Sequence, residues 1–383
     1  MAKFELVSTC LFGLEKLLGA EIDALGLKRL ETMDGRVTFE GDEIDIARAN
    51  INLRTAERVY IKLGSFSAQT FDDLFEGTKA LPWENFIGQK DSFPVKGHSI
   101  KSTLISIPDC QKIIKKAIVN RLGGKYGINW FEESGVKYQI VFFIFKDIVS
   151  LMIDTSGIAL HKRGYRPIAG EAPLRETLAA AMVMTARIRP DVMLWDPFCG
   201  SGTIAIEAAM MMTGKAPGLG REFAGEQFDC ISKNVWGLAR DEAMGIVPIA
   251  PDYEARASDI DGNVLKVAVA NIRRAGVEKN IKVFNVDARK IQKPDRKGSI
   301  ICNPPYGERM LEISEAEQLY REIGKTFSTF DPWQIYILSA SENFERLYGR
   351  RADKVRKLYN GMIPCNLYQF FKPVNNKGNK YVR

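Results

Sequence analysis

The fold of the second half of this chain is decided by the stretch VMLWDPFCGSGT, which runs from Val192 to Thr203. It predicts an apolar strand that ends at Asp196, a glycine turn and the start of a helix. Gly200 and Gly202 permit positive φ angles and a close approach of a ligand to the backbone. The helix N-terminus that follows offers free N–H groups and the positive end of a dipole. The stretch therefore predicts a loop that holds a carboxylate or a phosphate.

Helical and extended patterns alternate on both sides of this loop. The periodicity predicts helices over 174–187, 203–212, 262–275 and 314–329. It predicts strands over 191–195, 254–258, 281–285, 298–302, 333–339, 353–358 and 365–372. Strands that alternate with helices indicate an α/β domain with a doubly wound sheet over 174–383.

The first 160 residues have a different organisation. Residues 1–66 read as strand 3–9, helix 11–25, hairpin 28–40, helix 43–58 and strand 59–66, which is the order of a ferredoxin-like unit. Residues 67–160 form a second mixed block with helices 72–80 and 109–123 and strands near 93–96, 138–145 and 147–154. Residues 161–173 are rich in glycine, proline and cations, and we expect them to be a linker.

Composition excludes several classes of protein. The 383 residues are 45% hydrophobic and 26% charged, which is ordinary globular usage rather than that of a disordered, collagen-like or coiled-coil chain. No apolar run approaches the roughly 18 residues of a membrane span, and the first residues show no signal peptide. Six cysteines without CxxC spacing and two histidines supply metal sites poorly. We expect a cytoplasmic protein with free thiols, without a metal and without a membrane partner.

Two segments concentrate positive charge on a chain whose net charge is only +7. The segment 110–131 has no acidic residue and carries the cations Lys112, Lys115, Lys116, Arg121 and Lys125. The segment 345–383, which includes Lys354 and Lys357, is also strongly basic. Separated basic patches favour a polyanionic partner, although a solvated helix face and tail would give the same pattern.

Two acidic motifs follow later strands. Asp259 ends the predicted strand 254–258, where a carboxylate suits a ribose diol. The glycine loop with Ala205 fits the weak dinucleotide pattern GxGxx[GA], but Asp259 lies much farther than about 20 residues beyond it, which disfavours NAD. Asp287 and Ala288 follow the next strand, and Asp287 could reach an adenine amino group. Each acid alone would also suit a turn or a helix cap.

The most specific motif is Asn303-Pro304-Pro305-Tyr306, directly after an apolar strand. The two prolines fix the backbone, so that the Asn303 amide oxygen and the Pro304 carbonyl become rigid acceptors. Two acceptors on the hydrogens of a planar amine localise its lone pair and stabilise the positive charge that develops during attack. Tyr306 can stack on an unpaired base. A simple proline turn is the alternative interpretation.

In this order, the motifs DPFCGSGT, SDID, VDA and NPPYGER resemble the class I S-adenosylmethionine-dependent amino-methyltransferases over 174–383. The resemblance implies a Rossmann-like catalytic domain in which Asn303, Pro304, Pro305 and Tyr306 hold the target amine. It also implies a cofactor site for S-adenosylmethionine built from Asp196, Phe198, Gly200, Gly202, Thr203, Asp259, Ile260, Asp287, Ala288 and Asn303.

Residues 160–166, 172–181, 352–354 and 360–361 are similar to the bacterial 23S rRNA guanine-N2 methyltransferases of the L type. Those enzymes carry a ferredoxin-like and a THUMP domain, an RNA-binding module, before the catalytic domain. The resemblance implies methylation of guanine N2 in structured RNA, 23S rRNA first, with Arg163 and Arg166 near the RNA and no DNA substrate. Some L-type enzymes are fused to a second methyltransferase domain; this chain resembles the unfused form, which leaves the modified position open.

Other functions stay open at this stage. The NPPY tetrapeptide also serves adenine-N6 and protein-glutamine methylation, and a tRNA could replace rRNA. A C5-pyrimidine methyltransferase would need a cysteine nucleophile, for which Pro364-Cys365 offers the dipeptide. A non-catalytic RNA-binding or ribosome assembly factor is the alternative from another class. The sequence does not indicate the oligomeric state.

Overall fold

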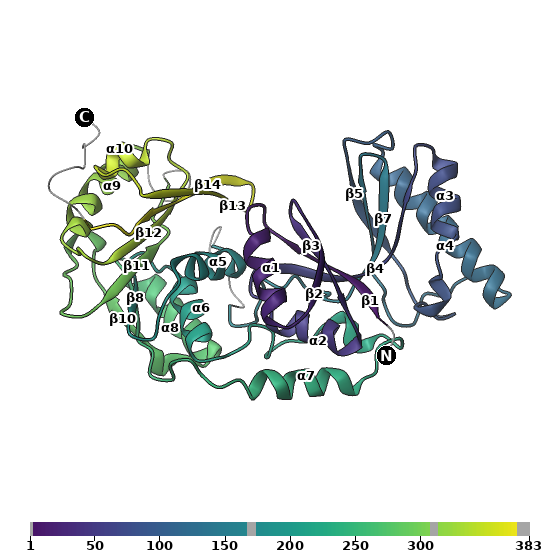
Figure 1. The fold of residues 1–383 in the computed structure, drawn as a ribbon, viewed down its shortest axis with the longest axis horizontal. Coiled ribbons are helices and arrows are strands. Elements are labelled where there is room, and N and C mark those ends of the chain that lie inside the picture. Colours follow the sequence, from purple (N-terminus) through teal and green to yellow (C-terminus); the bar gives the residue numbers. More distant parts are fainter. Residues whose placement is uncertain (1–2, 167–173, 307–312, 374–383) are drawn as a thin grey trace. The chain divides into compact units, whose positions relative to one another are not determined.

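The computed structural model describes residues 3–166, 174–306 and 313–373 (Figure 1). They form two compact units that interleave along the chain. Unit 1 holds most of the chain up to 160 together with 221–243, and unit 2 holds 11–18, 161–220 and the part after 243. The linear domain boundaries at 66, 160 and 173 stay predictions, and most of the predicted linker, 167–173, lies outside the described residues.

Unit 1 is built on one seven-stranded sheet with the order β2-β3-β1-β4-β7-β6-β5. Its strands are β1 (Phe4–Cys10), β2 (Lys28–Met33), β3 (Arg36–Gly41), β4 (Ala56–Ser67), β5 (Val95–Ile100), β6 (Ile140–Phe145) and β7 (Ile148–Asp154). Its helices are α2 (Glu43–Asn52), α3 (Phe71–Lys79) and α4 (Ile107–Tyr126), together with the part of α1 (Glu15–Ala24) from residue 19 onward. The long strand β4 pairs with β1 on one side and β7 on the other, so one strand joins the ferredoxin-like part to the second block.

Helix α2 is shorter than the predicted helix 43–58, because a partly buried carboxylate binds the backbone where the helix ends. The backbone N–H groups of Arg54 and Thr55 donate to the two carboxylate oxygens of Glu21, at 2.7 and 3.0 Å. Burial raises the pKa of Glu21, while these hydrogen bonds oppose that rise. The backbone is extended from Leu53 and enters β4 at Ala56.

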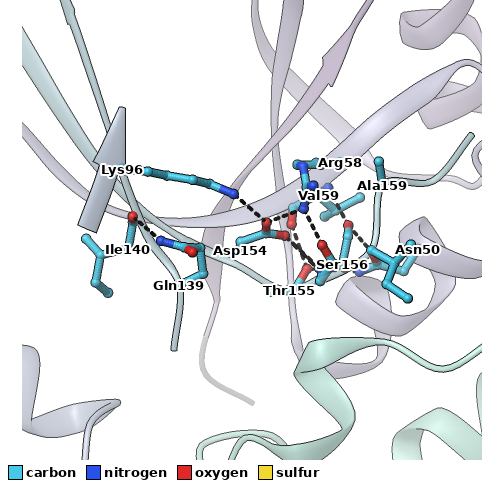
Figure 2. A network of polar contacts seen from close by, with 12 residues as sticks. Asn50, Arg58, Val59, Lys96, Gln139, Ile140, Asp154, Thr155, Ser156 and Ala159 are labelled. Atoms are coloured by element: carbon cyan, nitrogen blue, oxygen red, sulfur yellow. Dashed lines mark hydrogen bonds and ion pairs between the residues drawn. The ribbon is translucent and has the colours of Figure 1, made fainter. Parts of the chain in front are cut away.

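A polar network fixes the end of β7 against β4 and α2 (Figure 2). The Asp154 carboxylate is buried and forms ion pairs with Arg58 and, at 3.8 Å, with Lys96. The Ser156 hydroxyl donates to the Asn50 side-chain oxygen at 2.6 Å, and the Asn50 amide donates to the Thr155 hydroxyl at 2.9 Å. Because an unmade hydrogen bond costs more when it is buried, this closed network specifies how these elements join.

Unit 2 has a second seven-stranded sheet with the order β10-β9-β8-β11-β12-β14-β13. Its strands are β8 (Met193–Asp196), β9 (Ala255–Asp259), β10 (Ile281–Asn285), β11 (Gly298–Cys302), β12 (Gln334–Ser339), β13 (Lys354–Asn360) and β14 (Ile363–Phe370). The five neighbouring strands β10, β9, β8, β11 and β12 are parallel to one another. Strand β14 pairs antiparallel with β12, and β13 pairs antiparallel with β14. With helices α5 (Glu176–Ala186), α6 (Thr203–Met212), α8 (Gly262–Ala275) and α9 (Ile313–Ser328), this confirms the predicted Rossmann-like fold.

Two helices were not predicted, α7 (Asn234–Met244) and α10 (Phe344–Tyr348). Helix α7 belongs to unit 1, within the segment 221–243 that interrupts unit 2 in sequence. Its buried residues Trp236, Ala239 and Ala243 have helical spacing, so the signal was present but short. No helix of the described chain is long and apolar enough to cross a membrane.

Candidate functional site

The parallel strands of unit 2 bring the predicted motifs together at one edge of the sheet. Asp196 ends β8, Asp259 ends β9, and Asn303 follows β11 directly. Asp287 lies two residues after β10. Because the carboxyl ends of parallel strands meet at the same edge, four motifs that are far apart in sequence lie at one end of the sheet, the end at which open α/β sheets bind ligands.

The glycine loop between β8 and α6 is tied to the end of β9. The Gly200 N–H donates to the Asp259 carboxylate at 3.0 Å, and the Cys199 N–H donates to the Ser258 carbonyl at 2.9 Å. Gly200 and Gly202 have φ angles of +50° and +86°, and Gly202 is the N-cap of α6. A side chain at either position would strain the backbone, so the turn needs glycine here.

Asp196 is the clearest ligand-binding feature of this loop. Its side chain is buried, and one carboxylate oxygen accepts a hydrogen bond from the Phe198 N–H at 3.1 Å. The other oxygen has no hydrogen-bond partner within the described residues. Burial, with a contribution from the nearby Asp259 carboxylate, raises the pKa of Asp196 well above its usual range. A cationic amino group, such as that of a methionyl moiety, would satisfy this oxygen.

The end of β9 can carry a ribose and a planar ring. The Asn285 amide donates to the carbonyls of Asp259 and Ile260, at 2.9 Å each, which holds the turn in place. Ile260 is 64% exposed although it is a large apolar residue, so its side chain is free to cover a ring. The residues at this edge therefore fit S-adenosylmethionine.

Asp287 makes more contacts within the protein than the sequence indicates. Both of its carboxylate oxygens accept hydrogen bonds from the Arg289 guanidinium, and Arg289 holds the pKa of Asp287 below its usual range. The carboxylate keeps further acceptor capacity, but an adenine would have to share it with Arg289. Ala288 is buried in the core of unit 2.

Phe198 and Thr203 support the loop from within the protein. Phe198 packs against the aromatic core of unit 2, and the Thr203 hydroxyl accepts a hydrogen bond from Arg166 at 3.0 Å. The same arginine forms an ion pair with Glu176 at 3.0 Å. Arg166 was missed as a cofactor-loop residue because nothing in its sequence context connects it to residue 203.

The predicted RNA contacts of Arg163 and Arg166 are therefore corrected. Both side chains are nearly inaccessible, at 2% and 6% exposure. Arg163 faces the buried Glu207 carboxylate at 3.5 Å. A guanidinium that is buried against a carboxylate has no surface for a phosphate, so these two arginines pair within unit 2 instead.

The Asn-Pro-Pro-Tyr loop is held by two tyrosines. The Tyr306 hydroxyl donates to the Asn303 amide oxygen, and the Tyr320 hydroxyl donates to the Pro305 carbonyl at 2.8 Å. Ser339 donates in turn to the Tyr320 hydroxyl at 3.2 Å. Burial raises the pKa of Tyr306 well above its usual range, so its hydroxyl stays a donor at neutral pH. Arg309, in the NPPYGER motif, lies outside the described residues.

The cysteines near the site are poorly suited to nucleophilic attack. Cys199, Cys302 and Cys365 are all buried, and burial raises the pKa of the first two. The Cys365 sulfur lies 3.9 Å from the Tyr306 hydroxyl, where it packs beneath the loop. Because a thiolate is the reacting form, these surroundings argue against C5-pyrimidine methylation. The described residues contain no group of three or more metal-ligating side chains.

The predicted RNA-binding cations of α4 fall into two groups. Arg121 makes a bidentate contact with Glu84, at 2.6 and 3.0 Å, and Lys115 pairs with Glu133. These two positive charges are already neutralised within the protein. Three cations remain exposed on α4, namely Lys116, Lys125 and Lys112, the last of which pairs with the exposed Asp109 at 3.6 Å. On β13 of unit 2, Lys354 and Lys357 are exposed, whereas the basic tail 374–383 lies outside the described residues.

Three family models match the chain in succession. An RlmL ferredoxin-like domain matches residues 5–60, a THUMP domain matches 68–154, and an RMKL-like methyltransferase domain matches 163–369. YpsC of Bacillus subtilis (strain 168), provisionally named an RNA methyltransferase, is 43% identical over 383 residues, 99% of each chain. The ribosomal RNA large subunit methyltransferase K/L of Psychromonas ingrahamii is 34% identical over 370 residues, 94% of this chain but 49% of that protein.

Solved structures of similar sequence share the whole fold. One from Listeria monocytogenes, described as a predicted N6-adenine-specific DNA methylase, is 45% identical with a TM-score of 0.92 and covers 97% of both chains. Another, described provisionally as a methyltransferase and solved in complex with SAH, is 39% identical with a TM-score of 0.91. It covers 98% of this chain and 100% of its own.

We expect Asp196→Asn to separate ligand binding from stability. The substitution removes a buried carboxyl group. Because the pKa of this group is raised in the folded protein, its ionisation makes the ligand-free protein less stable as pH rises above the ordinary carboxyl range. The melting temperature at neutral pH should therefore stay equal or increase. Affinity for S-adenosylmethionine, measured by calorimetry, should fall about 10- to 100-fold, as expected for the removal of a charge-assisted hydrogen bond.

Asp191→Asn is the matched control. Asp191 precedes the glycine loop in sequence, as Asp196 does, but it is about half exposed and pairs with Lys297. It should leave cofactor affinity unchanged. Equal affinities of the Asp196 variant and the unsubstituted protein would remove Asp196 from the cofactor site.

Proposed function

Because this chain belongs to the RMKL-like methyltransferase family, in the form with an RlmL ferredoxin-like and a THUMP domain, we propose that it methylates guanine N2 in structured RNA. We propose 23S rRNA as the first substrate to test, S-adenosylmethionine as the methyl donor and the cytoplasm as the location. The observation that carries the reaction type is the Asn303–Tyr306 loop beside a glycine loop whose buried Asp196 has one carboxylate oxygen without a hydrogen-bond partner among the described residues.

The reaction needs acceptors more than it needs a base. S-adenosylmethionine supplies, when bound, an electrophilic methyl group on a sulfonium. The Asn303 amide oxygen and the Pro304 carbonyl would accept the two hydrogens of the exocyclic amine and stabilise the positive charge that develops on nitrogen. The amine loses a proton readily once it is methylated, so no general base is required.

Tyr306 supports this arrangement in two ways. Its hydroxyl donates to the Asn303 amide oxygen, which keeps that side chain in one rotamer. An amide oxygen has two lone pairs, so a substrate amine can still donate to the other one. The Tyr306 ring provides a surface on which a base taken out of its stack can rest.

The substrate assignment depends on the relatives and on charge. YpsC is provisionally named an RNA methyltransferase, and the K/L protein is named for large-subunit ribosomal RNA. Exposed cations on α4 and on β13 supply phosphate contacts of the kind that position an RNA without reading its sequence. THUMP domains are RNA-binding modules in the family that this chain resembles, which supports RNA over DNA.

Adenine N6 is the second candidate base. The similar structure from Listeria monocytogenes is described as a predicted N6-adenine-specific DNA methylase. An Asn-Pro-Pro-Tyr loop accepts hydrogens from either exocyclic amine, so the loop alone does not choose between guanine and adenine. Only the identity of the methylated nucleoside can decide between guanine and adenine.

Nucleoside mass spectrometry tests the proposal directly. The purified chain is incubated with S-adenosylmethionine and rRNA from cells that lack its gene, and the RNA is then digested. We expect new N2-methylguanosine. N6-methyladenosine would overturn the base, whereas methylation of tRNA alone would overturn the substrate. A chain that binds the cofactor but methylates no RNA, including assembly intermediates, would favour an assembly factor or a protein substrate.

We expect Asn303→Ala to reduce kcat for methyl transfer by about 10²- to 10³-fold, the range for removal of one preorganised group at a reacting centre. Cofactor affinity should change less than about threefold, because Asn303 acts on the amine. Tyr306→Phe, which removes only the hydroxyl that holds Asn303, should give a smaller decrease in kcat. If Asn303→Ala weakened cofactor binding as strongly as turnover, the loop would belong to the cofactor site.

The exposed cations of α4 should contribute to RNA affinity through charge. We expect Lys112→Glu with Lys116→Glu to weaken RNA binding and to reduce the slope of log K against log salt by about two, because each lysine that binds a phosphate contributes about one to that slope. Lys266→Glu with Lys279→Glu makes the same charge change on exposed residues of unit 2 and is the control. An unchanged salt slope would mean that α4 is only a solvated face.

A further inference from the structure

One face of the unit 1 sheet carries a hollow that belongs to no motif of the sequence. Residues opposite each other in neighbouring strands point to the same face. The registers Val7↔Thr38, Lys62↔Met152 and Phe143↔Ser150 therefore place side chains from β1, β3, β4, β6 and β7 together. The hollow has a volume of about 360 Å³, within the range of sites that bind one small molecule or nucleotide.

The floor of the hollow is aromatic. Strand β6 reads IVFFIF, and its alternate residues Phe142 and Ile144 are fully buried on the opposite face. Phe143 and Phe145 face the hollow and are only partly buried, with ring centroids 6.2 Å apart and planes inclined by 23°. Two neighbouring, nearly parallel rings on an open sheet form a platform on which planar bases can stack.

A guanidinium completes this platform. The Arg36 guanidinium carbon lies 3.9 Å from the centre of the Phe143 ring. Its N–H groups make no hydrogen bond or ion pair to any of the described side chains, and burial lowers the pKa of Arg36. Lys146 is exposed at the rim, and Glu31 is the one acid among the lining residues of the hollow. The hollow thus offers unused donors and an excess of positive charge to an anion.

We propose that this face binds an unpaired segment of the RNA, with bases stacked on Phe145 and on the Arg36 guanidinium that covers Phe143, and a phosphate at the edge of that guanidinium. The inference deepens the proposed function and rests on it for the identity of the polymer. A duplex would not fit this role, because its bases are already stacked on each other and cannot reach a phenylalanine ring. An apolar protein segment would make no use of the unpaired Arg36 donors.

The experiment measures binding of the full chain to a fluorescent, unstructured RNA decanucleotide and to the same sequence as a duplex. Phe143→Leu keeps an apolar side chain against the core but removes the ring. Arg36→Gln removes the charge without touching β6. We expect each to weaken binding to the unpaired strand about 5- to 100-fold, the range for removal of one stacking interaction, and to leave duplex binding unchanged. Phe71→Leu, at a partly exposed position on α3, is the matched control.

A photo-crosslink gives a second readout that does not depend on variants. A decanucleotide that contains 4-thiouridine should crosslink to the peptide that holds β6, and unlabelled strand should compete that crosslink away. Crosslinks confined to α4 or to unit 2, or equal affinities of the Phe143, Arg36 and Phe71 variants, would overturn the sheet-face site.

The two proposals fail in different ways. If the chain methylates RNA while the Phe143 and Arg36 substitutions change neither affinity nor KM, the sheet-face site is wrong and the proposed function stands. If the chain binds unpaired RNA through Phe143 but methylates none, the proposed function fails and the sheet-face site stands.

Discussion

The hydrogen bond from the Gly200 N–H to the Asp259 carboxylate joins the two strand ends on which the catalytic unit depends. Parallel pairing of β8 with β9 places both strand ends at one edge, but it does not fix the loop that follows β8. The hydrogen bond does so, and it requires a positive φ of +50° at residue 200. No atom would meet a Cβ there, so the need for glycine is conformational rather than steric. A site made of distant motifs is thereby held as one rigid object.

Buried arginine–glutamate pairs also hold the helix that follows the glycine loop. Arg166 reaches both Thr203, at the start of α6, and Glu176, at the start of α5. Arg163 faces Glu207 one turn farther along α6. Removal of one partner from such a pair leaves an unpaired buried charge, which costs more than the pair itself contributes. Arg163 and Arg166 are therefore coupled to the helix that follows the glycine loop.

The sequence predicts most of the fold because its signals are local. The glycine loop, the period of α6 and α8, and the ferredoxin-like order all depend on residues close together in the chain. It misplaces the end of α2, because the group that ends the helix is the Glu21 carboxylate, more than thirty residues away. It misses α7, whose buried residues are few and whose packing partners, such as Phe223 for Trp236, lie outside the helix. Tertiary partners, not propensity, decide both cases.

The residues of the candidate site also divide into those that local sequence signals predict and those that depend on tertiary contacts. Strand-end motifs identify Asp196, Asp259 and Asn303 because backbone geometry brings strand ends together in any such sheet. No comparable rule predicts which surface cations are available to bind RNA. Lys115 and Lys116 are neighbours in sequence, yet Lys115 is neutralised by Glu133 whereas Lys116 is exposed. Strand β6 makes the point most clearly. Its six apolar residues predict a buried strand, and only the register with β7 reveals that Phe143 lies opposite Ser150 on the open face. An aromatic residue becomes a binding hypothesis only when the pairing of its strand is known.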